Sequence, residues 1–305
     1  MTARVPSRDS VRVRSYAKIN WTLDVLFKRE DGYHEIRTIL QTVSLHDHIR
    51  LSLTDGEIEA SCDDPLVPCD STNLAYRAAA ALRELTGTGA GARIEIEKRI
   101  PVGAGLGGGS SNAAATLLGL CSLWGCAVGY PDLVRLSTEL GSDVPFFLIG
   151  GTAAGVGRGE EVYPLEPVER SEIVLVNPGF SVATRTVYEK LSRLTRLESA
   201  RIIPVTLVAA KHISEAALSG RNDLEEAALG IHPEIGELKL KLIGLGARHS
   251  LMSGSGATVL GVFDNERASE EAVTVFRSAG MWAARVRTVN GKEYQDSVIK
   301  AYSNH

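Results

Sequence analysis

The sequence predicts an α+β protein with two domains. Segments that alternate like antiparallel strands and segments with helical periodicity come in groups instead of alternating one by one. A length of 305 residues suits two domains or one large one. Residues 166–170 are charged and contain proline, as linkers often do. We therefore expect an N-terminal domain over residues 1–165 and a C-terminal domain over residues 166–305.

The first expected element is a long strand over residues 11–25, where apolar and polar residues alternate. Lys18 and Asn20 fall on its polar face and point the same way, about 7 Å apart. The turn pair Asp31-Gly32 follows. Further strand-like segments cover residues 38–45, 49–53 and 58–60.

Helices and one more strand surround a glycine-rich loop in the next part of the chain. Residues 73–86 are Ala-rich with apolar residues on one side, which predicts a helix. The alternation in "ARIEIEKRI" predicts a strand that ends at Ile100. After the loop, residues 110–124 are apolar nearly all round, which indicates a buried helix. Residues 133–140 form another expected helix, with Asp132 as its N-cap.

A short helix in "SDVPFF" and glycine-rich strands follow, before the expected domain boundary. A strand over residues 172–176, the turn "NPGF" and helices up to about residue 245 come next. The chain is expected to close as strand, helix and strand, with the strands in "LMSGSGATVLGVF" and "AARVRTV" and the helix over residues 266–278.

Composition excludes several classes of protein. The net charge of −4 and the lack of a long basic run argue against a nucleic-acid binder. The four cysteines form no C-x-x-C pair and no common zinc spacing, which favours a reducing compartment. The polar first ten residues do not resemble a signal peptide, and no apolar run reaches the ~20 residues of a membrane helix. We expect a cytoplasmic protein without a membrane partner.

The stretch "PVGAGLGGGSSNAAA", residues 101–115, holds five glycines. A tight turn needs only one or two. "GAGLGG" matches a dinucleotide fingerprint, but no strand ends in an acid about 20 residues further on. The third interpretation is a triphosphate-binding loop, in which bare backbone N–H groups and a helix N-terminus bind anions. It lacks the Walker-A lysine, so a cation must come from elsewhere.

This loop resembles the second motif of the GHMP kinases. Further stretches resemble that family in the expected order, over residues 16–263: "YAKINWTLDV", "REDGYHEIRT", "GSDVPFF", "NPGFSVATRTVYEK" and "LMSGSGATVLGVF". The resemblance implies an N-terminal domain like domain 2 of ribosomal protein S5 and a ferredoxin-like C-terminal domain. It also implies an ATP- and Mg²⁺-dependent kinase. The "DGYH" and "GSDVP" pieces point to the branch that phosphorylates the 2-hydroxyl of a cytidine-diphosphate-linked methylerythritol in the non-mevalonate isoprenoid pathway.

The resemblance assigns the catalytic pair. Local sequence alone favours Asp143 as a helix cap before Pro145. By resemblance, Asp143 is the general base, and Lys18 is the missing cation that keeps it ionised and offsets charge on the transferred phosphoryl group.

The nucleotide is expected on the glycine loop and at Asn73, which could equally cap the helix that follows it. The loop residues are Pro101, Val102, Gly103, Ala104, Gly105, Leu106, Gly107, Gly108, Gly109, Ser110 and Ser111. No dedicated magnesium ligand is evident, and the ATP phosphates, Ser111 and Asp143 are the expected donors.

By resemblance, the cytidine pocket contains Asn20, Tyr33, His34, Thr184 and Tyr188, with Tyr33 and Tyr188 as aromatic faces for the base. Tyr188 could equally be a core residue of a helix. Residues 253–256 suit either a place near the substrate phosphates or a plain glycine turn.

Three other functions stay open. The chain could be a GHMP kinase for another small alcohol, a nucleotide-binding relative without catalysis or, more remotely, a dinucleotide-dependent dehydrogenase. Either a monomer or a weak homodimer is expected.

Overall fold

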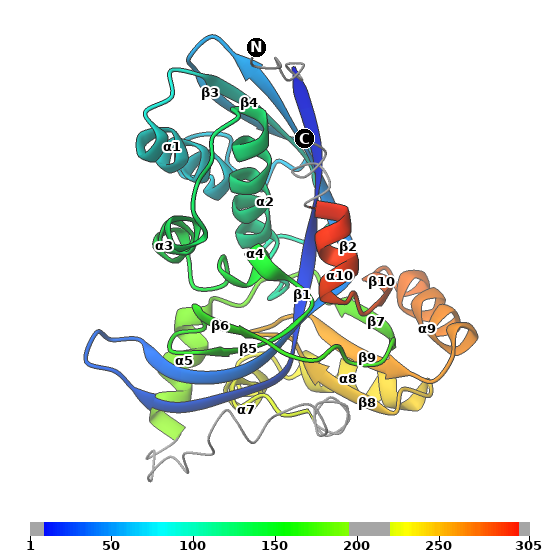
Figure 1. Cartoon of the computed structure of the whole chain (residues 1–305). Helices are drawn as coiled ribbons and strands as arrows, with labels where there is room; N and C mark the ends of the chain where they lie inside the picture. The colour runs from blue at the N-terminus through cyan, green and yellow to red at the C-terminus, as the bar shows by residue number, and fades with distance from the viewer. Residues whose placement is uncertain (1–8, 195–219, 299–305) are drawn as a thin grey trace.

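The computed structural model describes residues 9–194 and 220–298 and contains two sheets. The larger sheet has the order β3-β4-β2-β5-β6, with β1 paired antiparallel to β2. Its strands are β1 (Ser10–Lys28), β2 (His34–Thr54), β3 (Ile58–Cys62), β4 (Gly91–Glu97), β5 (Thr152–Val156) and β6 (Glu161–Pro164). In Figure 1, β1 and β2 run the height of the molecule and turn outward beside α5.

The second sheet is antiparallel throughout, with the order β10-β7-β9-β8. Its strands are β7 (Glu172–Asn177), β8 (His249–Met252), β9 (Val259–Phe263) and β10 (Trp282–Arg287). Numbered within this unit, the strands lie 4-1-3-2, and the chain follows the β-α-β-β-α-β pattern of ferredoxin-like domains. The predicted α+β class is confirmed.

The helices divide between the two sheets. Those that precede β7 in the chain are α1 (Leu74–Thr86), α2 (Gly108–Leu123), α3 (Tyr130–Leu140) and α4 (Phe146–Ile149). Those that follow β7 are α5 (Thr184–Leu194), α7 (Leu224–Leu229), α8 (Glu234–Gly244), α9 (Glu266–Ser278) and α10 (Gly291–Val298). Helix α8 packs on β8 and β9, and α9 packs on β7 and β10. None of the helices in the described part of the chain is long and apolar enough to cross a bilayer.

Helix α2 is buried along most of its length, as its uniformly apolar sequence predicts. It lies between α1 and the long strands β1 and β2 (Figure 1). Apolar side chains of Leu82, Leu117 and Ile49 meet there in a first core cluster. This packing fixes the start of α2 relative to β1, and the functional site lies at that junction.

A separate cluster joins the two sheets. Ile19 and Ile39 from the long strands pack with Ile173 and Leu260 from the second sheet. The last helix crosses back as well, since Tyr294 and Val298 of α10 lie in the first core cluster. The proposed division at residue 165 falls between β6 and β7, but the core of the first part includes side chains from the end of the chain.

Several predictions of local structure were wrong. Helix α3 starts at Tyr130 after the N-cap Gly129, so Asp132 lies in its first turn and does not cap it. Strand β4 ends at Glu97 instead of Ile100, and β2 is one strand where two were expected. Helix α10 was not predicted.

Candidate active site

A cleft of about 990 Å³ lies where the glycine loop faces the β1–β2 hairpin and α5. A second cavity, of about 380 Å³, lies on the other side of the same loop. Both are lined by Gly103, Gly105, Gly107 and Ser110. The loop is therefore the wall that the two cavities share.

The density of glycines in the loop has a geometric reason. Gly103, Gly105 and Gly107 all have positive φ angles, between 64° and 74°, which side chains disfavour. A Cβ on Gly105 would also lie 2.4 Å from the carbonyl oxygen of Ser253. A Cβ on Gly107 would lie 2.9 Å from Cγ of Lys18. The backbone must thus approach both the second domain and β1 closely.

The loop leads directly into α2, whose N-cap is Gly107. No side chain caps this helix start, and its first turn carries no acidic residue. The first N–H groups of a helix lack intrahelical partners, and the helix dipole adds partial positive charge there. The loop and the start of α2 therefore form a site for an anion such as phosphate.

Lys18 and Asp143 meet at the floor of the larger cleft. Lys18 Nζ lies 3.4 Å from Asp143 Oδ2 and donates a hydrogen bond of 2.9 Å to Asn20 Oδ1. Asn20 Nδ2 in turn donates to Thr38 Oγ1 at 2.7 Å. Lys18 and Asn20 are only 4% and 2% exposed, so this polar part of β1 is buried. This chain of contacts holds the ammonium group beside the carboxylate.

Backbone contacts fix Lys18 from two sides. Its amide N–H donates to the carbonyl of Leu106, at 3.0 Å. Gly254, in the loop between β8 and β9, lies so close that a Cβ there would be 3.4 Å from Lys18 Nζ. The buried ammonium position is thus built from the strand, the glycine loop and the second domain together.

Asp143 is not a helix cap. The cap position of α4 is Pro145, and no side chain caps that helix. The Asp143 side chain is 38% exposed and lines the cleft. Its carboxylate is therefore available to a molecule bound in the cleft, and the local interpretation as a cap is corrected.

Two residues expected to contact the nucleotide, Ser111 and Asn73, make hydrogen bonds within the protein. Ser111 is 1% exposed, lines neither cavity, and its hydroxyl accepts a hydrogen bond of 2.7 Å from Ser15. Asn73 caps α1, since its Oδ1 accepts from the Ala75 amide at 2.8 Å and its Nδ2 donates to the Pro68 carbonyl. Asn73 still lines the smaller cavity, whereas Ser110 is the serine that reaches both cavities.

Aromatic residues from the β1–β2 hairpin and α5 also line the cleft. The rings of His34 and Tyr188 stack with centroids 4.9 Å apart and planes at 26°. Tyr33 is 55% exposed, and the guanidinium carbon of Arg158 lies 5.0 Å from its ring centroid. Thr184 and Ser255 share a hydrogen bond of 2.8 Å. All of these residues line the cleft, so the structure brings together the residues expected for substrate.

Burial reinforces the uncharged forms of the His34 and Tyr188 side chains. Burial lowers the pKa of His34 below its ordinary value, and the positive charge of Lys28 lowers it further. Burial raises the pKa of the Tyr188 phenol, and the negative charge of Asp143 adds to that rise. At neutral pH the cleft thus presents a neutral imidazole and a protonated phenol.

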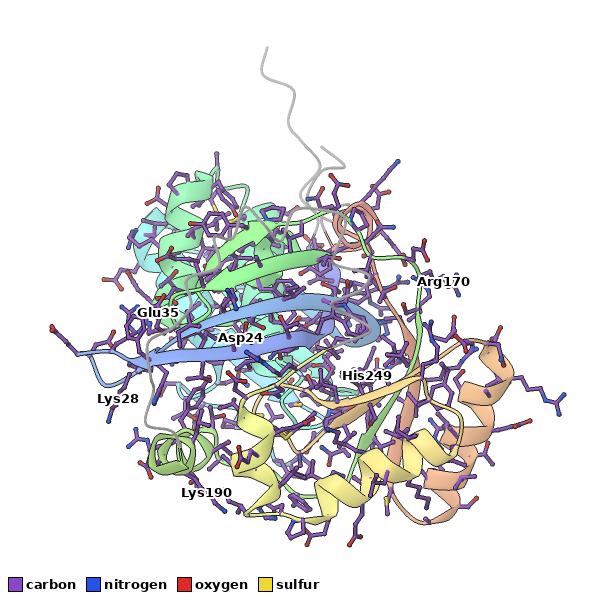
Figure 2. The ribbon with its side chains drawn as sticks, turned by 90° about the horizontal axis from the view of Figure 1, so that it is seen from below. Asp24, Lys28, Glu35, Arg170, Lys190 and His249 are labelled. Atoms are coloured by element: carbon purple, nitrogen blue, oxygen red, sulfur yellow. The ribbon has the colours of Figure 1, made fainter. Side chains whose placement is uncertain are left out.

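The cleft wall also carries cations that the sequence did not single out. Lys28, Arg158 and Arg185 line it in addition to Lys18. Figure 2 labels Lys28 near the outer end of the β1–β2 hairpin, with α5, marked by Lys190, beside it. These residues come from distant segments and follow no spacing, so only the folded arrangement identifies them. The four basic side chains share the cleft with three acidic ones, Asp31, Asp143 and Glu189, which leaves one basic side chain in excess.

No three His, Cys, Asp or Glu side chains gather into a metal-binding group anywhere in residues 9–194 and 220–298. The oxygen-bearing side chains that line the cleft include Ser110, in the first turn of α2, and Asp143, the partner of Lys18. Mg²⁺ prefers such oxygens and commonly takes only one or two from the protein, with phosphates and water completing its shell. The donors present fit an ion that arrives with a nucleotide.

Comparison with known proteins supplies the family. The model of the GHMP kinases N-terminal domain matches residues 73–151, and that of the GHMP kinases C-terminal domain matches residues 209–280. A 4-diphosphocytidyl-2-C-methyl-D-erythritol kinase of Geobacter sp. (strain M21) is 46% identical over 90% of this chain and 97% of its own length. The kinase of the same name from Syntrophus aciditrophicus (strain SB) is 40% identical over 90% of this chain.

Solved structures of two kinases are similar to this chain over most of its length. A crystal structure of 4-(cytidine 5'-diphospho)-2C-methyl-D-erythritol kinase superposes with a TM-score of 0.77 at 36% identity, covering 92% of this chain and all of that one. Homoserine kinase from Cytophaga hutchinsonii, at 19% identity and a TM-score of 0.71, shares the fold over 96% of this chain and 99% of its own. The predicted two-domain GHMP kinase fold is confirmed. The chain belongs to the GHMP kinase family, in the branch formed by the 4-diphosphocytidyl-2-C-methyl-D-erythritol kinases.

Proposed function

We propose that this protein is an ATP-dependent kinase that phosphorylates the 2-hydroxyl of 4-diphosphocytidyl-2-C-methyl-D-erythritol in the non-mevalonate isoprenoid pathway. The observation that carries the chemistry is the Lys18–Asp143 pair, 3.4 Å apart, in the cleft that the glycine loop lines. The names of the relatives support the choice of substrate.

The two cavities give the reactants separate places. The nucleoside of ATP occupies the smaller cavity beside Asn73 and residues 101–109, and the triphosphate crosses the glycine loop toward the larger cleft. The first amides of α2 and the loop hold the phosphates, because backbone N–H groups and the helix dipole favour anions. This path brings the γ-phosphate toward Lys18 and Asp143.

Asp143 accepts the proton of the attacking hydroxyl. A general base must lie within hydrogen-bond reach of the proton that it removes, and its carboxylate opens into the cleft. Lys18 lies beside that carboxylate and balances charge on the phosphoryl oxygens during transfer. Asn20 and Thr38 hold the ammonium group in place. Phosphoryl transfer needs mainly such positioning and charge stabilisation.

Mg²⁺ is part of this proposal. Ser110 and Asp143 are the residues that would hold it, together with the phosphates of ATP. When bound, the ion neutralises charge on the β- and γ-phosphates.

The part of the cleft lined by Tyr33, His34 and Tyr188 takes the cytidine. Tyr188 and Tyr33 offer flat faces on which a pyrimidine stacks, and neutral His34 offers hydrogen bonds to the base edge. Lys28, Arg158 and Arg185 suit the diphosphate of the substrate. Because His34 already stacks on Tyr188, the base must enter by parting that pair or by extending the stack.

An assay of ATP consumption tests the proposal against its alternatives. We expect turnover with the cytidylyl substrate and little with mevalonate or homoserine. Preferential turnover of either other alcohol would assign a different GHMP activity. ATP binding without turnover of any alcohol would favour a non-catalytic relative. The cytoplasmic location and the monomeric or weakly dimeric state remain predictions.

A further inference from the structure

Asp47 is a fully buried carboxylate below the glycine loop, with 0% of its surface exposed. It lies in β2, and its charge is paired with Lys98, whose Nζ donates to Asp47 Oδ2 at 2.8 Å. Buried charges require a partner and several hydrogen bonds to offset lost hydration. The number and origin of its hydrogen bonds indicate what this residue does.

Four hydrogen bonds converge on Asp47 from the two flanks of the loop. Oδ1 accepts from the amides of Arg99 and Ile100, at 2.7 and 2.8 Å, which directly precede the loop. Oδ2 accepts from Lys98 and from Nδ2 of Asn112, at 3.0 Å, which follows the loop in α2. One carboxylate thus ties together the start and the end of residues 101–111.

A second layer of contacts extends this tie. Asn112 Nδ2 also donates to Ser15 Oγ in β1, at 2.9 Å, and Ser15 donates to Ser111. Lys98 donates to the carbonyl of Ile100 in addition to Asp47. The end of the loop is therefore fixed to β1, the strand that carries Lys18.

We propose that Asp47 is a positioning residue for ATP, which sets the shape of the phosphate-binding loop without touching the nucleotide. This inference rests on the proposed function. The loop has positive φ angles at three glycines, so its own sequence does not favour one conformation, and its ends must be held from outside. A carboxylate is required because all four partners of Asp47 are hydrogen-bond donors. The side chain of an asparagine in its place would point its own NH₂ donor at two of these donors.

Calorimetric titration with an ATP analogue that is not hydrolysed, in the presence of Mg²⁺, tests this role. We expect Asp47→Asn to weaken nucleotide binding by roughly 10- to 100-fold, since small misplacements of binding groups have effects of that size. The KM for the cytidylyl substrate should change much less. Amide hydrogen exchange should rise within residues 101–111.

Two further variants make the result decisive. Val273 lies in the core of the second domain, so the variant Val273→Ala controls for a general loss of stability. Asn112→Ala removes the hydrogen bonds to Asp47 and Ser15 at the end of the loop, and it takes the place of Asp47→Asn if that variant does not fold. Wild-type nucleotide affinity in Asp47→Asn or, failing that, in Asn112→Ala would overturn the inference. Lack of nucleotide binding by the wild type would overturn the proposed function and this inference with it.

Discussion

Lys18 and Asp143 show how one buried cation gains its place from residues that are distant in sequence. The ammonium group is almost fully buried, yet it contacts a carboxylate and an amide oxygen. The carboxylate is more exposed than its partner, which leaves one side open to a bound hydroxyl. This asymmetry suits a base held beside a fixed cation.

Replacing the carboxylate by an amide should separate catalysis from stability. Because Asp143 caps no helix and is partly exposed, we expect Asp143→Asn to melt near the wild-type temperature and to bind ATP. Its kcat should fall by about 10²–10⁴, the usual contribution of a positioned base. The double variant with Lys18→Met should be little worse than either single one, since residues that act as a unit are not additive. Turnover near the wild-type rate in Asp143→Asn would refute its role as base.

The stacking face of Tyr188 should act on one reactant only. We expect Tyr188→Ala to raise the KM for the cytidylyl substrate roughly tenfold or more, the value of one lost base stack. Tyr188→Phe keeps the ring and serves as the matched control. Steady-state kinetics with each reactant varied in turn gives both KM values. An equal rise in the KM for ATP would make Tyr188 a packing residue instead.

At the scale of elements, α10 supports the segment that carries Asp143. Tyr294 is buried, and its hydroxyl donates a hydrogen bond of 2.6 Å to the carbonyl of Phe147 in α4. Its ring covers Gly150, where a Cβ would lie 2.2 Å from the ring. Helix α10 therefore holds α4, which begins three residues after Asp143.

Removing this hydroxyl should loosen the segment. We expect Tyr294→Phe to lower the free energy of unfolding by about 1–3 kcal/mol, because a buried carbonyl loses its donor. It should also lower kcat more than it changes the KM for ATP. Tyr130→Phe, at a 57% exposed tyrosine, is the control and should change neither quantity. Urea titration and kinetics provide the measurements, and wild-type values for Tyr294→Phe would exclude this support.

The sequence predicted the elements with strong periodicity and missed those made by tertiary contacts. The alternation of apolar and polar residues around Lys18 predicted β1, and the nearly uniform apolar character of residues 110–124 predicted α2. The burial of Lys18 depends on loops from both domains, so the alternation could not show it. Helix α10 has a short, mostly polar sequence, and only two of its side chains, Tyr294 and Val298, are buried. The partners of Asp47 lie 51 to 65 residues away in sequence, beyond any local pattern.

At the scale of the whole molecule, the two predicted domains share their cores. The cluster around Ile19 and Ile173 joins the sheets, and Val289, Tyr294 and Val298 complete the first core. We therefore expect a fragment of residues 1–165 to lack a cooperative urea transition in circular dichroism. A chain of residues 1–298 keeps these contacts and should unfold cooperatively. A cooperative transition in the short fragment would show that the first domain is independent.

The identity of the reaction product shows whether the protein phosphorylates the 2-hydroxyl of the cytidylyl substrate. The protein, ATP, Mg²⁺ and 4-diphosphocytidyl-2-C-methyl-D-erythritol are incubated together, and the product is examined by phosphorus and carbon NMR. We expect ADP and a new phosphomonoester whose phosphorus couples to the carbon that carried the 2-hydroxyl. A phosphoryl group on another hydroxyl, or ADP with only inorganic phosphate, would refute the proposed reaction.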